Sequence, residues 1–232
     1  MAPDPVVETS RKAPSMPAKE KECQTVIYLV RHARSEWNGT HRVTGQLNPD
    51  LSTEGLEQVR WLARLFANMR LHGVYASDLS RSVDTAFAVA SGQGLTVEQL
   101  PGLRELHFGV LQGRFRDERD PNAHAMWRAR NRNKSSYRAP GSEVMSDLAA
   151  RVIPCVDRIR QEMTGRNCLI VGHRSTNRVI LGTLMGWPRE DWWPLRLRSR
   201  WVYEIRLSTP SQLSSIRLTA GPPYRRIDGL KT

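Results

Sequence analysis

Leu29-Val30-Arg31-His32-Ala33-Arg34-Ser35-Glu36-Trp37-Asn38 places an Arg-His pair directly after a short apolar run. The run, residues 26–30, consists of β-branched, aromatic and aliphatic residues and is too short for a helix, so it predicts a buried strand. In open α/β sheets the chemistry lies beyond the carboxyl ends of the strands. We therefore expect Arg31 and His32 at such an end, where they can bind a phosphate and attack it. An Arg-His pair after a strand is common in proteins, so it indicates a function only together with the segments downstream.

Three later segments complete a set with this pair. Each carries one chemically capable side chain: Arg81 inside a helix that follows a strand in segment 74–86, Glu105 in the loop 103–109, and His173 after the apolar strand 168–171. With these motifs in this order the chain resembles the histidine phosphatase superfamily, also called the phosphoglycerate mutase-like family. That family is marked by Arg-His-Gly, by Ser-Asp-Leu-x-Arg, by a glutamate before a glycine-rich turn, and by a late strand that ends in histidine. The resemblance covers roughly residues 25–207.

Two departures from the family pattern stand out. Ala33 replaces the usual glycine of the Arg-His-Gly motif, which is a change between small residues. The late histidine is followed by Arg-Ser-Thr-Asn at residues 174–177 where a Gly-Gly pair is commoner. We interpret the second departure as a subfamily difference in substrate contact.

The resemblance implies a role for each of five residues. His32 is the expected nucleophile, and surrounding arginines should lower its pKa and keep the attacking ring neutral. Arg31 and Arg81 form the expected phosphate clamp, since guanidinium groups match phosphate oxygens in bidentate geometry. His173 is expected to donate to a phosphate oxygen. Glu105 is the expected general acid, a role that needs a protonated carboxyl group and that shielding by its apolar neighbours would favour.

Further contacts are implied less directly. Asn38 and Gln46 are candidate substrate contacts by resemblance, although Asn38 suits a turn as well. Arg174 joins them because it follows the late histidine at a helix N-terminus. We expect no metal and no cofactor, because arginines take the place of a cation and no cluster has metal-ligand spacing.

Strands alternating with helices predict an α/β fold, a three-layer α/β/α sandwich with a mostly parallel sheet, phosphoglycerate mutase-like. Residues 1–22 are proline-rich and predict a disordered N-terminal tail, residues 23–220 the histidine phosphatase domain, and residues 221–232 a C-terminal tail. Within the domain the patterns predict strands at 73–76, 95–100, 168–171, 201–207 and 214–219, and helices starting at residues 52 or 53, 78, 141 and 175. Pro154 predicts a kink or a restart in the third of these helices. The alternation in 201–207 predicts one exposed face.

Composition narrows the class of protein. The 232 residues, 39% hydrophobic and 25% charged, suit one globular domain. We expect no membrane span and no secretory signal, because no apolar run of the required kind is present. Three scattered cysteines, Cys23, Cys155 and Cys168, argue against a disulfide framework and against zinc, so a reducing cytoplasm is the expected location.

The net charge of +12 invites a nucleic-acid interpretation, which we do not favour because the excess is not one lysine-rich arm. Residues 114–138 hold eight basic residues against three acidic ones. This block is either an arginine-rich lid over a phosphate pocket or a solvated basic face. Trp127 within it is a candidate substrate contact.

The pattern as a whole predicts a phosphatase that hydrolyses a phosphate monoester of a small anionic metabolite through a phosphohistidine. The alternatives are a phosphoglycerate mutase-type transfer and, from another class, a non-catalytic module that binds phosphorylated ligands or nucleic acid. Resembled mutases carry a longer insertion than residues 113–140 here, and a shorter lid favours hydrolysis by water. The expected partner is a small phosphorylated substrate, with neither nucleic acid nor membrane. The sequence leaves undecided whether the protein forms a homodimer, which substrate it takes and in which pathway it acts.

Overall fold

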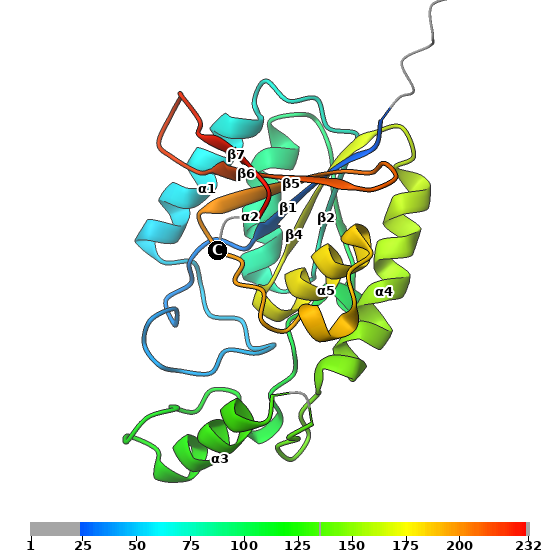
Figure 1. Ribbon diagram of the computed structural model, residues 1–232. Coiled ribbons are helices and arrows are strands. Elements are labelled where there is room, and N and C mark those ends of the chain that lie inside the picture. Colours follow the sequence, from blue (N-terminus) through cyan, green and yellow to red (C-terminus); the bar gives the residue numbers. More distant parts are fainter. Residues whose placement is uncertain (1–23, 135, 231–232) are drawn as a thin grey trace, which may run out of the picture.

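Seven strands form one mixed sheet in the computed structural model, which describes residues 24–134 and 136–230 (Figure 1). The predicted tail 1–22 lies outside the described residues. The sheet order is β3-β2-β4-β1-β5-β6-β7, with strands β1 Val26–Arg31, β2 Gly73–Ala76, β3 Val97–Gln99, β4 Asn167–Gly172, β5 Trp201–Arg206, β6 Gln212–Arg217 and β7 Arg226–Asp228. The four neighbours β3, β2, β4 and β1 pair in parallel, and the remaining three strands add through antiparallel pairings.

Helices cover both faces of this sheet (Figure 1). The α-helices are α1 Thr53–Phe66, α2 Ser80–Ser91, α3 Pro121–Arg132, α4 Met145–Glu162 and α5 Arg174–Met185, with short 3-10 turns η1 Pro101–Leu103, η2 Gly109–Leu111 and η3 Arg189–Asp191. Helix α3 lies beyond the sheet, apart from the other helices. No helix in the described part of the chain is long and apolar enough to cross a bilayer.

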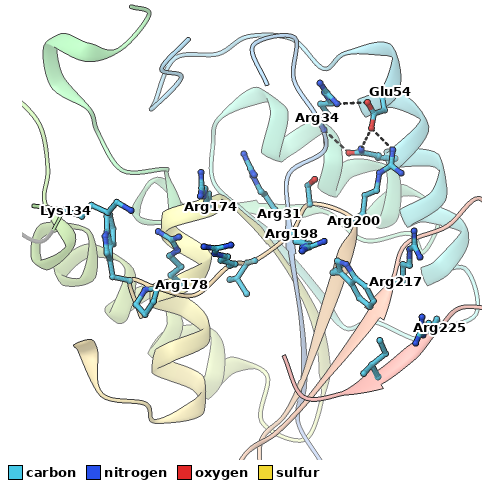
Figure 2. Close-up of a pocket in the computed structure, with 18 residues that line it drawn as sticks. Arg31, Arg34, Glu54, Lys134, Arg174, Arg178, Arg198, Arg200, Arg217 and Arg225 are labelled. Carbon is cyan, nitrogen blue, oxygen red and sulfur yellow. Dashed lines mark hydrogen bonds and ion pairs between the residues drawn. The ribbon is translucent and has the colours of Figure 1, made fainter. Parts of the chain in front are cut away.

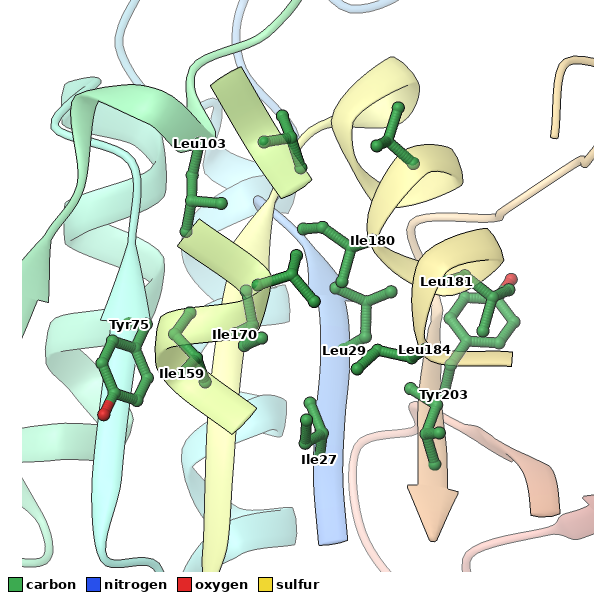
Figure 3. Close-up of a cluster of buried hydrophobic side chains, with 14 of the residues drawn as sticks. Ile27, Leu29, Tyr75, Leu103, Ile159, Ile170, Ile180, Leu181, Leu184 and Tyr203 are labelled. Carbon is green, nitrogen blue, oxygen red and sulfur yellow. The ribbon is translucent and has the colours of Figure 1, made fainter. Parts of the chain in front are cut away.

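The core consists of two layers, because alternate residues of a strand face opposite sides of the sheet. In β1, Ile27 and Leu29 pack with α4 and α5 (Figure 3), whereas Tyr28 and Val30 pack on the side of α1 and α2. All four are at most 8% exposed. The fold class is therefore confirmed as a three-layer α/β/α sandwich with a mostly parallel sheet.

Local sequence signals account for several helix boundaries. Ser52 caps α1, with its hydroxyl accepting the Gly55 N–H at 3.2 Å, as residue types at that position predict. Leu56, in the first turn of α1, is 47% exposed. Pro154 causes no restart, since α4 is one continuous helix around it. The residue lies on the exposed side of α4, where the helix tolerates the missing N–H.

Two expectations, about strand β5 and about the C-terminal tail, were wrong, and one helix was not predicted. Strand β5 is buried on both faces, because it lies inside the sheet between β1 and β6. Glu204, the residue that suggested an exposed face, is 1% exposed and pairs with Arg206 and Arg226. The predicted C-terminal tail 221–232 contains β7, which carries Arg226. The basic block 114–138 contains helix α3, which the sequence analysis did not predict.

Candidate active site

Two histidines meet at the carboxyl ends of neighbouring parallel strands. The register of β1 and β4 pairs Arg31 with Gly172, so His32 and His173 follow side by side. The His32 N–H donates to the Gly172 carbonyl at 2.9 Å, and the two ring centroids are 5.1 Å apart. The sheet topology therefore brings together residues that are far apart in sequence.

The hydrogen bonds of His32 define which ring nitrogen is free to react. Its Nδ1 lies 2.7 Å from the carbonyl oxygen of Ala33, an acceptor, so Nδ1 carries the proton of the neutral ring. The Arg81 Nε–H points at His32 Nε2 from 3.3 Å. The lone pair of the neutral ring therefore sits on Nε2, beside a guanidinium group.

Electrostatics keep this ring neutral. Burial lowers the pKa of His32 well below its ordinary value, and the guanidinium groups of Arg31 and Arg81 lower it further. The pKa of His173 is also lowered well below its ordinary value, first by burial and then by His32 and Arg81. Both rings are at most 4% exposed.

Arg31 and Arg81 approach this point from two elements. Arg31 ends β1, and its Nε is buried without a hydrogen-bond partner among the described residues. Arg81 lies in the first turn of α2, 1% exposed, and its Nη2 donates to the Gly45 carbonyl at 2.7 Å. Burial lowers the pKa of Arg81 to about 10, so it remains charged at neutral pH. The Arg31 Nε–H is available for an anion, whereas Arg81 also donates to the Leu47 carbonyl at 2.5 Å and to His32 Nε2 at 3.3 Å.

His173 is held from behind by Ser77. The Ser77 hydroxyl lies 2.6 Å from His173 Nε2, and Arg81 Nη2 lies 3.4 Å from its Nδ1. The preceding Gly172 makes room for Asn177, since a Cβ at Gly172 would stand 2.1 Å from Asn177 Oδ1.

Glu105 is fixed in the loop between η1 and η2. Its carboxylate accepts the N–H of Leu106 at 2.8 Å and that of Ser175 at 3.1 Å. Its neighbour Arg104 turns away and forms an ion pair with Asp78, so it does not compete for the Glu105 carboxylate. The Glu105 carbonyl accepts from Arg151 Nη2 at 2.9 Å, and Arg151 also donates to the carbonyl of Gly102.

A cavity of about 180 Å³ is lined by Arg31, His32, Arg81 and Glu105, whereas His173 is not part of its wall. It is rich in cations, with Glu105 as the carboxylate in its wall; the cations are Arg31, Arg42, Arg81, Arg116, Arg130, Lys134, Arg174 and Arg178. Trp127 is part of the wall and carries the guanidinium groups of Arg116 and Arg130 against its ring, each 5.2 Å from the ring centroid. Such a cavity suits a phosphate group, whose charge these donors can neutralise.

The three predicted substrate contacts have different surroundings. Asn38 lines the cavity, while its Oδ1 accepts the Ser35 N–H at 2.9 Å and so also closes a turn. Gln46 is not part of the wall, and its Nε2 instead donates to the Glu105 carbonyl at 3.0 Å. Arg174, at the start of α5, lines the cavity with an exposed side chain.

Six of the eight basic residues in the block 114–138 fall into two groups. One group supplies Arg116, Arg130 and Lys134 to the cavity wall, together with Trp127. The other group is neutralised locally in ion pairs: Arg114 with Asp120, Arg119 with Asp117, and Arg138 with Asp147. The block is thus neither a uniform lid nor a uniform solvated face.

Sequence reasoning missed several residues of this site, among them Arg42 in the cavity wall. Arg178 also lines the cavity and is 8% exposed; it lies one helical turn after Arg174, a spacing that could have revealed it. Ser77, which contacts His173, is the first residue of the Ser-Asp-Leu-x-Arg motif, whereas no local pattern marks Arg151, which supports the Glu105 loop. No group of three or more His, Cys, Asp or Glu side chains within residues 24–134 and 136–230 is arranged to hold a metal ion.

The comparisons with known proteins agree with this geometry. The model of the histidine phosphatase superfamily (branch 1) matches residues 27–212. A protein of Yersinia pestis (strain Pestoides F) named "Probable phosphoglycerate mutase GpmB" is 34% identical over 174 residues, which cover 75% of this chain and 80% of that protein.

Solved structures share the fold. An α-ribazole phosphatase from Shigella flexneri superposes with a TM-score of 0.75 at 23% identity, covering 89% of this chain and 100% of that one. A mycobacterial glucosyl-3-phosphoglycerate phosphatase in complex with VO3 gives a TM-score of 0.66 at 26% identity, covering 78% and 90%. The matched motifs, the sheet order and the family match together place this chain in the histidine phosphatase superfamily.

Proposed function

We propose that this protein hydrolyses a phosphate monoester of a small anionic metabolite through a phosphohistidine at His32. One observation carries the proposal: His32 lines a cation-rich cavity with its proton held on Nδ1 by the Ala33 carbonyl, so that its lone pair is on Nε2, beside the Arg81 Nε–H at 3.3 Å. A neutral, oriented imidazole beside fixed guanidinium groups is what in-line attack on phosphorus requires.

In the first step Nε2 attacks phosphorus and forms an N–P bond while the bond from phosphorus to the ester oxygen breaks. Glu105, in its protonated form, gives its proton to that oxygen. The ring becomes positive, and its Nδ1–H stays bound to the Ala33 carbonyl. In this scheme Arg31, Arg81 and His173 donate to the phosphoryl oxygens, where charge accumulates in the transition state.

In the second step water attacks phosphorus from the side that the alcohol has left. The Glu105 carboxylate accepts a proton from this water, and the N–P bond breaks, which returns the electron pair to Nε2. Inorganic phosphate leaves, and both His32 and Glu105 regain their starting protonation states. No metal enters this scheme.

Phosphoglycerate mutase-type transfer is the second candidate, because the 34% identical relative carries that name. The two reactions share the first step and differ in whether water or a phosphoglycerate accepts the phosphoryl group. Incubation with 3-phosphoglycerate separates them, since a mutase yields 2-phosphoglycerate whereas a phosphatase releases orthophosphate. We expect orthophosphate to be the main product.

The test of His32 is chemical trapping. A brief reaction of the protein with a labelled phosphate ester should leave acid-labile, base-stable label on His32. His32→Ala should lose both the label and turnover. His124→Ala, on α3 and outside the cavity wall, is the matched control and should keep both. Unimpaired turnover by His32→Ala would exclude the proposed mechanism.

A further inference from the structure

A second, larger hollow opens beside the catalytic cavity. Its volume is about 1220 Å³, and it shares Arg31, Lys134, Arg174, Arg178 and Trp193 with the catalytic cavity. The two spaces therefore adjoin, and Arg31 lies in the wall of both. A ligand whose phosphate is at His32 can extend into this hollow, which we name the arginine groove.

The arginine groove runs toward the antiparallel side of the sheet. Its far wall is built by Arg196, Arg198 and Arg200 ahead of β5, by Arg217 on β6, and by Arg225 ahead of β7. In Figure 2 the cations form a row from Lys134 past Arg174, Arg31 and Arg198 to Arg217 and Arg225. Strand β7, in the segment that was expected to be a tail, helps to build this wall.

Charge in the arginine groove is almost all of one sign. Ten of its lining residues are cations and only Glu54 is acidic. Glu54 is already engaged by Arg34 and Arg200, at 2.8 and 2.7 Å. Among residues 24–134 and 136–230, none of the other eight cations has a carboxylate partner within ion-pair distance: Arg31, Lys134, Arg174, Arg178, Arg196, Arg198, Arg217 and Arg225.

Several arginines elsewhere on the surface differ in this respect. Arg104, Arg114, Arg119, Arg138 and Arg158 each pair with a carboxylate. Other arginines outside the groove, such as Arg60 and Arg166, form no ion pair among the described residues either. What distinguishes the arginine groove is that eight such cations line one hollow.

Two of the cations are buried at a cost that an anion would offset. Arg178 is 8% exposed, and its recorded partners are the Leu195 carbonyl, at 2.7 Å, and the ring of Trp193. Arg31 has a buried Nε without a partner in the described chain. A buried charged donor without an acceptor is unfavourable, and a bound phosphate supplies the acceptor that the Arg31 Nε–H lacks.

We propose that the arginine groove binds a second phosphate group of the substrate, so that the natural substrate is a small metabolite carrying at least two phosphates. This inference rests on the proposed function, which places the scissile phosphate at His32. The row of unpaired guanidinium forks matches tetrahedral oxyanions in bidentate fashion. A single-stranded nucleic acid is a poorer match, since such ligands need a series of stacking rings. Of the two aromatic residues in the wall, Trp201 is only 8% exposed.

The experiment measures competition against hydrolysis of p-nitrophenyl phosphate. Orthophosphate fills only the catalytic cavity, whereas tripolyphosphate and inositol hexakisphosphate can also reach the arginine groove. We expect both polyphosphates to inhibit at concentrations at least about tenfold below that of orthophosphate, since one additional charge-assisted contact accounts for roughly that factor. Equal inhibition by all three would overturn the proposal.

Variants locate the effect. Arg198→Gln/Arg217→Gln/Arg225→Gln removes three exposed cations that line only the arginine groove. It should weaken inhibition by the polyphosphates about tenfold or more and leave orthophosphate inhibition and aryl phosphate turnover within about twofold. Arg60→Gln/Arg70→Gln/Arg166→Gln removes the same charge from exposed positions outside both cavities and should change nothing. Equal effects of the two triple variants would refute a specific site.

Two further readouts separate this proposal from the proposed function. If no phosphate ester is hydrolysed, the proposed function fails, and calorimetric titration of His32→Ala with tripolyphosphate still tests the arginine groove with the same triple variants. If aryl phosphate is hydrolysed but the polyphosphates show no advantage, only the second-phosphate proposal fails. A single-stranded oligonucleotide that competes better than tripolyphosphate would identify a nucleic-acid site instead.

Discussion

The backbone N–H of Ser175 donates to the Glu105 carboxylate at 3.1 Å, two residues after His173. Ser175 lies in the first turn of α5, so the positive end of that helix faces the carboxylate. One helix thus carries His173 at its N-cap and fixes Glu105 across the cavity from His32. Helix α5 therefore positions the proposed acid, whereas the carboxyl end of β1 positions the proposed nucleophile.

Glu105→Gln should leave binding in place and remove proton transfer. We expect kcat for an alkyl phosphate to fall by about 10²–10⁴, the usual contribution of general acid–base catalysis. With p-nitrophenyl phosphate, whose leaving group needs no proton, the first step should survive while attack by water slows, which gives a burst of p-nitrophenol in stopped-flow traces. Glu57→Gln, exposed on α1, is the control. Wild-type kcat on the alkyl ester would show that Glu105 is not the acid.

Ser77→Ala tests whether His173 must be held in place. The hydroxyl of Ser77 and the ring of His173 are both fully buried and 2.6 Å apart. Removing the hydroxyl leaves a buried ring nitrogen unpaired, which costs about 1–3 kcal/mol. We expect kcat to fall about tenfold or more with little change in KM. Ser82→Ala, which removes another buried hydroxyl from the start of α2, should affect stability alone. Equal kcat values for the two variants would argue against a positioning role.

The pH dependence follows from the lowered pKa of His32. A histidine whose pKa lies below the ordinary 6.5 stays neutral, and therefore nucleophilic, as pH falls past that value. The acid limb of kcat/KM should consequently have its midpoint below pH 6.5, measured with p-nitrophenyl phosphate over a constant-ionic-strength buffer series. A midpoint above 6.5 assigned to His32 would contradict the burial and the arginine neighbours as the controlling influences.

Activity should survive removal of divalent cations. Arg31, Arg81 and His173 already stand where a metal would neutralise the phosphate, and our mechanism assigns no step to one. Dialysis against excess chelator should leave kcat/KM unchanged within error, and added Mg²⁺ should not raise it. Loss of activity that only a divalent ion restores would refute the arginine clamp.

Local patterns predicted the half of the site that sits on strand ends. Arg31, His32 and His173 follow apolar runs whose burial on both faces is typical of central parallel strands, so their meeting point follows from sheet order. Arg81 could be placed because a strand and a helix flank it. The positions of these four residues could be predicted because each depends on a short local stretch of sequence.

The other half depends on packing between distant segments. Glu204 reads as an exposed residue in an alternating strand, yet Arg226, 22 residues later, neutralises it inside the sheet. Arg151 supports the Glu105 loop from α4, at a sequence distance of 46 residues. Such pairs have no local signature, because a charged residue on a helix or strand ordinarily faces solvent. The sequence did not predict the arginine groove for the same reason, because its lining residues come from segments that are far apart in the chain.

Within the basic block the structure singles out Arg130. This side chain is 8% exposed, and its guanidinium lies 4.8 Å from the ring centroid of Phe108 and 5.2 Å from that of Trp127. Burial lowers its pKa to about 10, so it is still a cation at neutral pH. Arg128, on the same helix, is exposed and outside the cavity wall, and Arg138 is held by Asp147.

Arg130→Met should therefore raise KM for the best substrate from a panel of phosphorylated metabolites about tenfold, the effect of losing one charge-assisted contact. Methionine keeps the apolar stem between the two rings, and a thermal melt checks that the fold is intact. Arg128→Gln and Arg138→Gln should leave KM unchanged, which a uniform basic lid would not allow. Arg130→Lys should recover part of the affinity, because the charge returns without the planar fork. Similar KM values for all three charge-removing variants would mean that the block acts only through its overall charge.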